Sequence, residues 1–390
     1  MPKQRDAAPE KPSTAAQSTP QDRPRPPMDL AWMQSGTEWG IRAQPGPAGL
    51  GIDQLNIGSY GEIPDIYPDN TMRPRGAKSY PGAPRMGYTV LEKHEVWTDN
   101  AAALYEEAIQ RRWKPATDID WAAIPAGPSE LERAKAQLLT IVSEQSWVQS
   151  VTYGHWLKEL SYGYYEVKVF LATVIFALAR HTEAFRKRAM LAGGGVGMQG
   201  PAGLNRQIID ARNFTEMILI NQLVTDSFME VLLGRLAAGA AHPAEARLYT
   251  LARQDRVRAL AFGQERVRDA LDAQPQRLAE FHGYLQRAEI AMVGDLRDTV
   301  TNEALAIVLG GDVEAMPAGA EQLAQMRSAQ ARAYLQRLAA AGIDRERRQA
   351  PHFALATGQI TREELTAMRE QAQQQAAKKA TALAPERSHA

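Results

Sequence analysis

The chain has 390 residues, with 45 Lys and Arg, 45 Asp and Glu, seven His and no Cys. Balanced charge excludes a global field that would attract nucleic acid or an acidic membrane. The absence of Cys excludes disulfide scaffolds, thiolate zinc sites and cysteine nucleophiles, so any metal would need carboxylate and His ligands. We expect no apolar run of the ~18 residues that span a membrane, and the N-terminus lacks the apolar core of a signal peptide. The sequence therefore predicts a soluble cytoplasmic protein.

The first quarter of the chain is not expected to form regular structure. Residues 1–28 are rich in Pro and small polar side chains and predict a disordered tail. Residues 29–97 interleave aromatic rings with Gly and Pro, which break any helical period. This pattern predicts an extended arm anchored by its rings, either on a partner or as a cap on the chain's own core. The candidate partner anchors are Trp32, Trp39, Tyr60, Tyr67 and Tyr80.

From residue 98 onward, apolar residues recur at helical spacing and predict an all-α fold. Capping boxes at Ser129/Glu132 and Thr361/Glu364 mark two helix starts. We expect helices over 98–113, 129–160, 164–192, 204–238, 243–272, 275–309, 319–342 and 361–380. Four of these are long and form two hairpins, which predicts a four-helix core within a bundle of residues 98–310. Accessory helices over 311–380 and a frayed tail at 381–390 complete the expected organisation.

Three stretches resemble a known family: LYEEAIQRRWKPATDIDW, EVKVFLATVIFALARHTEAFRKRA and DRVRALAFG. They are similar to bacterial ferritin-like oxidases and hydroxylases related to the small subunit of ribonucleotide reductase. The resemblance covers roughly residues 88–310 and implies a ferritin-like bundle. Such bundles hold a dinuclear metal through one Glu from each of two helices and a Glu-x-x-His pair from each of the other two.

Most of the family's ligand positions carry other residues here. By the resemblance, they correspond to Glu144, Leu178, His181, Asn221 (or Gln222), Arg256 and Ala259. Only Glu144 and His181 keep a ligating side chain. Arg256 would repel a metal ion and could pair with Glu144. The sequence therefore predicts no metal or other cofactor in this chain, and the alternative is a rearranged site drawn from Glu144, Glu183, His181, Asp226 and Asp255.

The resemblance also implies a partner. In multicomponent dinuclear-iron monooxygenases, a metal-bearing subunit pairs with a homologous, metal-free beta subunit, and this chain is similar to the latter. The expected function is a non-catalytic subunit that supports the structure and the docking of components, such as a reductase or a regulatory protein. The partner would carry the di-iron or manganese centre. Two alternatives stay open: a catalytic oxidase with a rearranged or mononuclear site, and a homo-oligomer that binds an apolar ligand in the vacated cavity.

Overall fold

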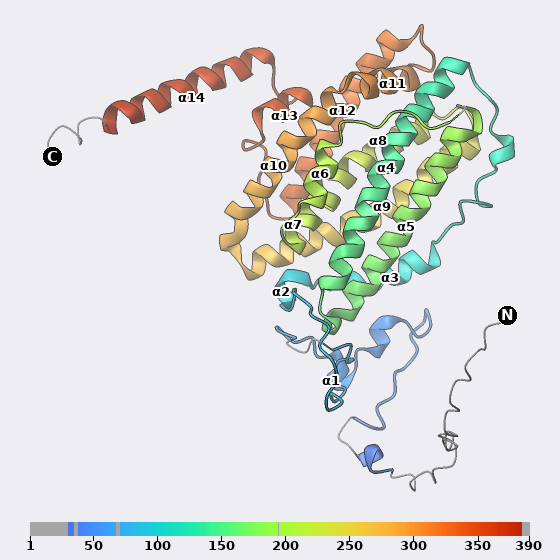
Figure 1. Cartoon of the computed structure of the whole chain (residues 1–390), viewed down its shortest axis with the longest axis vertical. Helices are drawn as coiled ribbons and strands as arrows, with labels where there is room; N and C mark the ends of the chain where they lie inside the picture. The colour runs from blue at the N-terminus through green and yellow to red at the C-terminus, as the bar shows by residue number, and fades with distance from the viewer. Residues whose placement is uncertain (1–29, 35–37, 68–70, 194, 384–390) are drawn as a thin grey trace, which may run out of the picture.

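A computed structural model describes residues 30–34, 38–67, 71–193 and 195–383 of the chain. Within these ranges the regular elements are helices, and the loops contain isolated bridges but no strand (Figure 1). This confirms the all-α prediction. The α-helices are α1 (Gly58–Gly61), α2 (Lys93–Val96), α3 (Ala101–Gln110), α4 (Ser129–Glu159), α5 (Tyr165–Ala192), α6 (Gly203–Ile209), α7 (Phe214–Ile218), α8 (Ser227–Gly239), α9 (Pro243–Ala273), α10 (Leu278–Arg297), α11 (Thr299–Gly310), α12 (Met316–Ala340), α13 (Pro351–Ala356) and α14 (Arg362–Leu383). Short 3-10 turns are η2 (Ala31–Gln34), η3 (Ile52–Leu55), η4 (Trp121–Ala123), η5 (Tyr162–Tyr164) and η7 (Pro275–Arg277), and a π-helical segment, η6 (Leu219–Asp226), joins α7 to α8.

Four long elements form the core: α4, α5, α9 and the continuous helix made by α7, η6 and α8. One apolar cluster joins the beginnings of α4 and α9 to the ends of α5 and α8; it includes Leu138, Phe185, Leu233 and Leu248. A second cluster joins the opposite ends and includes Tyr153, Phe170, Leu219 and Val267. Therefore α4 and α9 run in one direction, and α5 and α8 run in the other.

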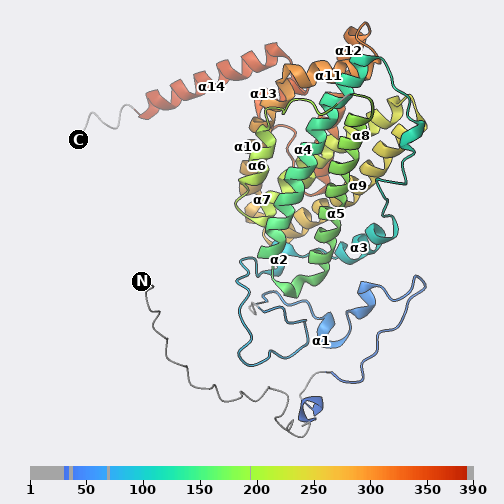
Figure 2. The same ribbon diagram turned by 45° about the vertical axis from the view of Figure 1, so that its right-hand side comes forward.

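Because α5 and α8 are parallel, the segment that connects them must return along the bundle. Residues 195–213 form the described part of this crossover, and its helix α6 packs against α4 and α10 (Figures 1 and 2). A four-helix bundle with one long crossover has the connectivity of ferritin-like folds. The predicted ferritin-like core is thus confirmed by the path of the chain itself.

The crossover corrects one predicted helix. The span 204–238 is not continuous, because α6 ends at Ile209 and a new helix begins at Phe214. Asn213 is extended at this break and accepts a hydrogen bond from the backbone N–H of Glu216. The predicted helix over 275–309 is likewise divided, since Asp298 caps α11 through the backbone N–H of Thr301.

The two capping boxes have different outcomes. The one at Thr361 and Glu364 is confirmed, because each side chain accepts from the other residue's backbone N–H, at 2.7 and 3.2 Å. The one at Ser129 is wrong. There α4 begins after Pro128, and Glu132 is bonded to Arg188 of α5 instead. A buried guanidinium is a stronger partner for this carboxylate than an exposed backbone N–H.

The described part of the arm caps one end of the bundle. Arg75 reaches into α5, where its Nη2 lies 2.6 Å from the Oε1 of Glu166, and both side chains are buried. Its Nε also donates to the carbonyl of Tyr60 at 2.8 Å. The hydroxyl of Tyr164 donates to the carbonyl of Leu91 at 2.7 Å. Much of residues 60–67 and 71–97 therefore packs on the chain's own core.

Two helical stretches, Tyr162–Ala192 and Phe214–Gly239, are long and apolar enough to cross a membrane by length and composition. This differs from the expectation that no run would reach such a length. In their most apolar windows, 50% and 89% of the residues are buried inside the bundle. Core helices of soluble proteins pass the same test, and burial in the bundle accounts for most of the apolar window of Phe214–Gly239 and for half of that of Tyr162–Ala192.

Candidate functional site

A layer of polar side chains crosses the middle of the four-helix core. It is built from Ser146 and Gln149 of α4, Asp226 of η6 and Arg256 of α9, all of which are buried. The Nη1 of Arg256 donates to the Oδ1 of Asp226 at 2.5 Å and also to the Oε1 of Gln149, while its Nη2 donates to the hydroxyl of Ser146 at 2.9 Å. The Nε2 of Gln149 donates to the same Asp226 oxygen at 3.1 Å. One guanidinium thus links three of the four core helices.

The π-helical segment places Asp226 in this layer. Every residue of η6 is buried, and the hydroxyl of Thr225 donates to the carbonyl of Ile220, five residues earlier, at 2.9 Å. A π turn holds one extra residue and re-aims the side chains after it, and such turns recur at functional sites. Burial raises the pKa of Asp226, and the guanidinium of Arg256 opposes that rise.

A second buried polar cluster surrounds Asp255, which precedes Arg256 on α9. Its Oδ2 lies 3.0 Å from the Nε2 of His181, and it accepts from Trp113 at 2.9 Å and from Arg180 at 3.1 Å. Arg258 binds the other carboxylate oxygen. Burial raises the pKa of Asp255, but the His181 contact and the two Arg charges outweigh this and hold it below its usual range. Both oxygens of this carboxylate are therefore already bonded.

His181 is held as a neutral ring. Burial lowers its pKa to about 4, although the neighbouring Asp255 acts in the opposite direction. Its ring stacks on that of Trp113, with the centroids 6.2 Å apart. The Nδ1 atom is buried and has no hydrogen-bond partner. His181 is the one His among the six positions matched to the family's ligands. It already contacts Asp255, whose two carboxylate oxygens are both hydrogen-bonded.

Glu144, the matched carboxylate, does not face the core. Its side chain is 40% exposed and pairs with Arg186 of α5. The expected pairing of Arg256 with Glu144 is therefore wrong, because Asp226 lies in the buried layer and Glu144 lies on the outer side of α4. Three other matched positions are also buried. Leu178 and Ala259 have no atom that can bind a metal, and Asn221 carries a neutral amide.

The rearranged set is not brought together either. Glu144 and Glu183 form exposed ion pairs with Arg186 and Lys187. Asp226 belongs to the Arg256 layer, so His181 and Asp255 are the two members in mutual contact. Within the described ranges, no group of three or more His, Asp or Glu residues is close enough to hold a metal ion.

The residues of the bundle centre do not fit a dinuclear metal ion pair. Arg cannot lose its proton in a protein and has no acceptor atom, so Arg256 repels a cation and cannot ligate one. The buried side-chain atoms without a partner at the bundle centre include those of the amides of Asn221 and Gln222, the hydroxyl of Tyr153 and the Nε of Arg256. Such groups suit an ordered water rather than two divalent ions.

Sequence reasoning missed the roles of Ser146 and Gln149. A signal was available, since polar Ser143, Ser146 and Gln149 recur three residues apart along the same face of α4, followed by Tyr153. All four are buried in the structure. A polar stripe on the inward face of a bundle helix predicts partners on the facing helices.

The candidate anchors of the arm fall into distinct environments. Trp39 and Tyr80 are 63% and 82% exposed. Tyr67 is buried, and Tyr60 is half-buried, with the guanidinium of Arg75 4.8 Å from the centre of its ring. The side chain of Trp32 lies outside the described residues. Tyr67 and Tyr60 thus pack on this chain, whereas Trp39 and Tyr80 present most of their ring surface to solvent.

No protein-family profile and no curated protein sequence matches the chain. Solved structures similar to it are those of R2-like ligand-binding oxidases. Two single-residue variants with a reconstituted Mn/Fe cofactor are each 17% identical, cover 68% of this chain and 95% or 94% of their own, and have a TM-score of 0.41. The oxidase with a metal cofactor after photoconversion is 16% identical over 68% of this chain and 95% of its own, at 0.39. Values this low carry no argument about the cofactor or activity of the present chain.

Proposed function

We propose that this chain is a metal-free, ferritin-like subunit that assembles with a homologous metal-bearing chain in a dinuclear-iron or manganese monooxygenase complex. Its role there is to support the catalytic subunit and to offer docking surface for a reductase or a regulatory component. The main support for this proposal is that Arg256 occupies a position matched to a metal ligand and forms an ion pair with Asp226. We place the complex in the cytoplasm, with no nucleic acid or membrane as partner.

The Arg256 layer supplies the physical argument. A metal pair in such a bundle cross-links helices through carboxylates, and the guanidinium fork makes comparable links through directed N–H donors. Its partners, on α4 and η6, satisfy both Nη atoms within the core. The bundle can therefore keep its shape with a fixed internal cation in place of exchangeable ones.

A partner is favoured by apolar side chains on the outer side of the α4–α5 hairpin. Trp147 and Val151 are one turn apart on α4, and their exposed fractions are 50% and 54%. Phe176 on α5 is 57% exposed. The rings of Trp147 and Phe176, like those of Trp39 and Tyr80 in the arm, are exposed to solvent. Large rings of this kind dominate the energetics of protein interfaces. An obligate interface of this type would bury more than ~2,000 Å².

Co-expression with a homologous chain that keeps both Glu-x-x-His pairs tests the proposal. Native mass spectrometry is expected to show a stable complex of the two chains, with metal bound in the partner. The double variant Trp147→Ser/Phe176→Ser is expected to weaken the complex at least tenfold, because each large ring anchor contributes above ~1 kcal/mol. The matched control Ile290→Ser, at an exposed position on α10, should leave assembly unchanged. A chain that does not bind the homologue and instead forms a stable homodimer would contradict the proposal.

The same material tests the alternative function. A catalytic oxidase with a mononuclear site would rely on His181 and Asp255, the two candidate ligands in contact. The isolated chain would then bind one metal ion, and His181→Ala would abolish that binding. Our proposal predicts no stoichiometric metal in the isolated chain or in its His181→Ala variant.

A further inference from the structure

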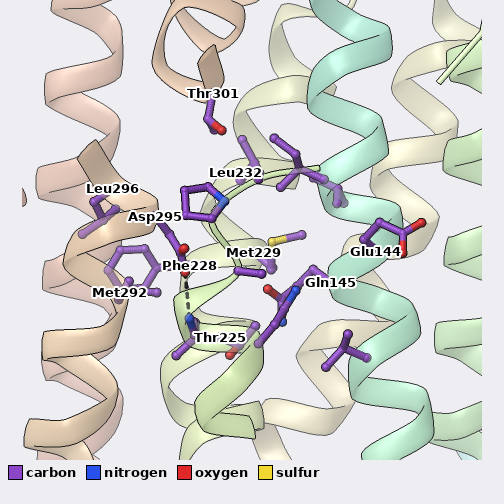
Figure 3. A pocket seen from close by; sticks show the side chains of 18 of the residues that line it. Glu144, Gln145, Thr225, Phe228, Met229, Leu232, Met292, Asp295, Leu296 and Thr301 are labelled. Atoms are coloured by element: carbon purple, nitrogen blue, oxygen red, sulfur yellow. Dashed lines mark hydrogen bonds between the residues drawn. The ribbon is translucent and has the colours of Figure 1, made fainter. Parts of the chain in front are cut away.

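A cavity of about 320 Å³ lies beside the polar core layer, between α4, α8 and the crossover, and α10, α11 and α12 close its other side. Its inner wall is made of buried apolar side chains, among them Leu138, Val142, Phe228, Met229, Leu232 and Leu305. Figure 3 shows side chains of α4, α8, α10 and α11 around the space, with the carboxylate of Glu144 directed away from it. The outermost lining residues belong to the crossover, so the cavity opens there.

Two polar atoms on the lining residues lack partners. The Nε2 of Gln145, on α4, and the Oδ1 of Asn205, on α6, are both buried and form no hydrogen bond. One is a donor and the other is an acceptor. Both atoms have almost no accessible surface, so they do not face the cavity directly, but rotation of either amide toward it would let a bound molecule pair with the atom. A hydroxyl group can accept from the first and donate to the second.

The charges of the lining cancel. Glu144 and Arg206 are at the rim and are paired with Arg186 and Asp210. The interior carries one acid and one base. Asp295 accepts from the backbone N–H groups of Gly203 and Leu204, both at 2.8 Å, and Arg327 balances its charge. A charged ligand would disturb this balance in a poorly solvated space, whereas an uncharged one would not.

The backbone at the mouth is strained in a way that suits a site. Ala202 has a φ of 59°, and in the described part of the chain it is the one residue other than Gly with a positive φ. Such a conformation costs of order 1–3 kcal/mol and tends to occur where a ligand or a function requires it. Ala202 lines the cavity and directly precedes α6.

We propose that this cavity binds an uncharged amphiphile with a medium-length apolar chain and one hydroxyl group, of the size of a medium-chain primary alcohol. A dry cavity of roughly 150 Å³ accommodates benzene, so this one has room for about twice as many carbon atoms. The site is separate from the Arg256 layer. It therefore stands or falls independently of the proposed subunit role.

Isothermal titration of the full chain with 1-octanol, 1-hexanol and octanoate tests the proposal. We expect 1-octanol to bind about 15-fold more tightly than 1-hexanol, since each buried methylene contributes roughly fourfold. Octanoate should bind at least tenfold more weakly than 1-octanol. Absence of a chain-length dependence, or tighter binding of octanoate, would overturn the proposal.

Variants locate the binding. Met229→Trp fills the cavity and should abolish binding of 1-octanol, whereas Ile290→Trp on the exposed side of α10 should leave it unchanged. Gln145→Leu removes the unpaired donor and should weaken 1-octanol about fivefold, with the octanol-to-hexanol ratio retained. Should Met229→Trp fail to fold, the Gln145→Leu result decides alone. Unchanged binding by the folded variants would mean that the alcohol binds elsewhere, against the proposal.

Discussion

Replacing Arg256 by Met should show how strongly the bundle depends on its internal cation. The substitution keeps a long side chain but leaves the carboxylate of Asp226 buried and uncompensated, at 2% exposure. Removing one member of a buried ion pair typically costs ~3–5 kcal/mol. Ser146 and Gln149 lose their contacts at the same time, so the upper half of this range is expected. Asp226→Asn should cost a similar amount, because it leaves the guanidinium without its counter-charge.

The double variant Arg256→Met/Asp226→Asn distinguishes charge pairing from simple packing. It carries no buried charge in this layer, and the amide that replaces the carboxylate of Asp226 can still accept from Gln149. Neutral replacement of a buried pair is often tolerated, so the coupling energy should be at least ~2 kcal/mol. Urea unfolding followed by circular dichroism measures all four proteins. Arg206→Met, from the exposed pair with Asp210, is the control and should change stability by less than ~1 kcal/mol. Additive single effects, or a loss below ~1 kcal/mol for Arg256→Met, would refute the reasoning.

Two further predictions concern His181 and the arm. The folded-state pKa of His181 is about 4. At a pH below its ordinary pKa of ~6.5, His181 therefore binds a proton in the unfolded chain but not in the folded chain. This contribution to the free energy of unfolding is complete above pH ~6.5 and falls by up to roughly 3 kcal/mol as the pH approaches 4. The midpoints of urea unfolding, measured at several pH values, should lose this pH dependence in His181→Gln but keep it in the exposed control His155→Gln. Arg75→Met removes the partner of buried Glu166 and should release the arm, so that limited proteolysis cuts within residues 38–90 faster while the helical circular dichroism signal is retained. Unchanged cleavage would show that other contacts hold the arm.

The core helices follow from local signals in the sequence. Pro243 stands at the first turn of α9, and the long apolar stretch of α5 carries no Gly or Pro. Breaks between helices were harder to predict, because apolar spacing continues on both sides of residues 210–213. The single side-chain cap supplied by Asn213 decides that break. Its signal is short and resembles that of many polar residues within helices.

The partner of Arg256 could not be predicted from sequence. Glu144 and Asp226 were both available as carboxylates, and the choice depends on how each helix is rotated. The π segment re-aims Asp226 into the core, while Glu144 falls on the outer face of α4. Which face of a helix points into the core depends on tertiary packing. The substituted positions at Leu178, Arg256 and Ala259 could be identified, but the network that replaces the ligands could not.

The most direct test of the account is the metal content of the purified full chain, expressed alone in medium supplemented with iron and manganese. A central guanidinium bonded to Asp226 predicts that inductively coupled plasma mass spectrometry finds neither metal above the level of a matched protein blank. A stoichiometric pair of iron or manganese ions in the isolated chain would contradict it.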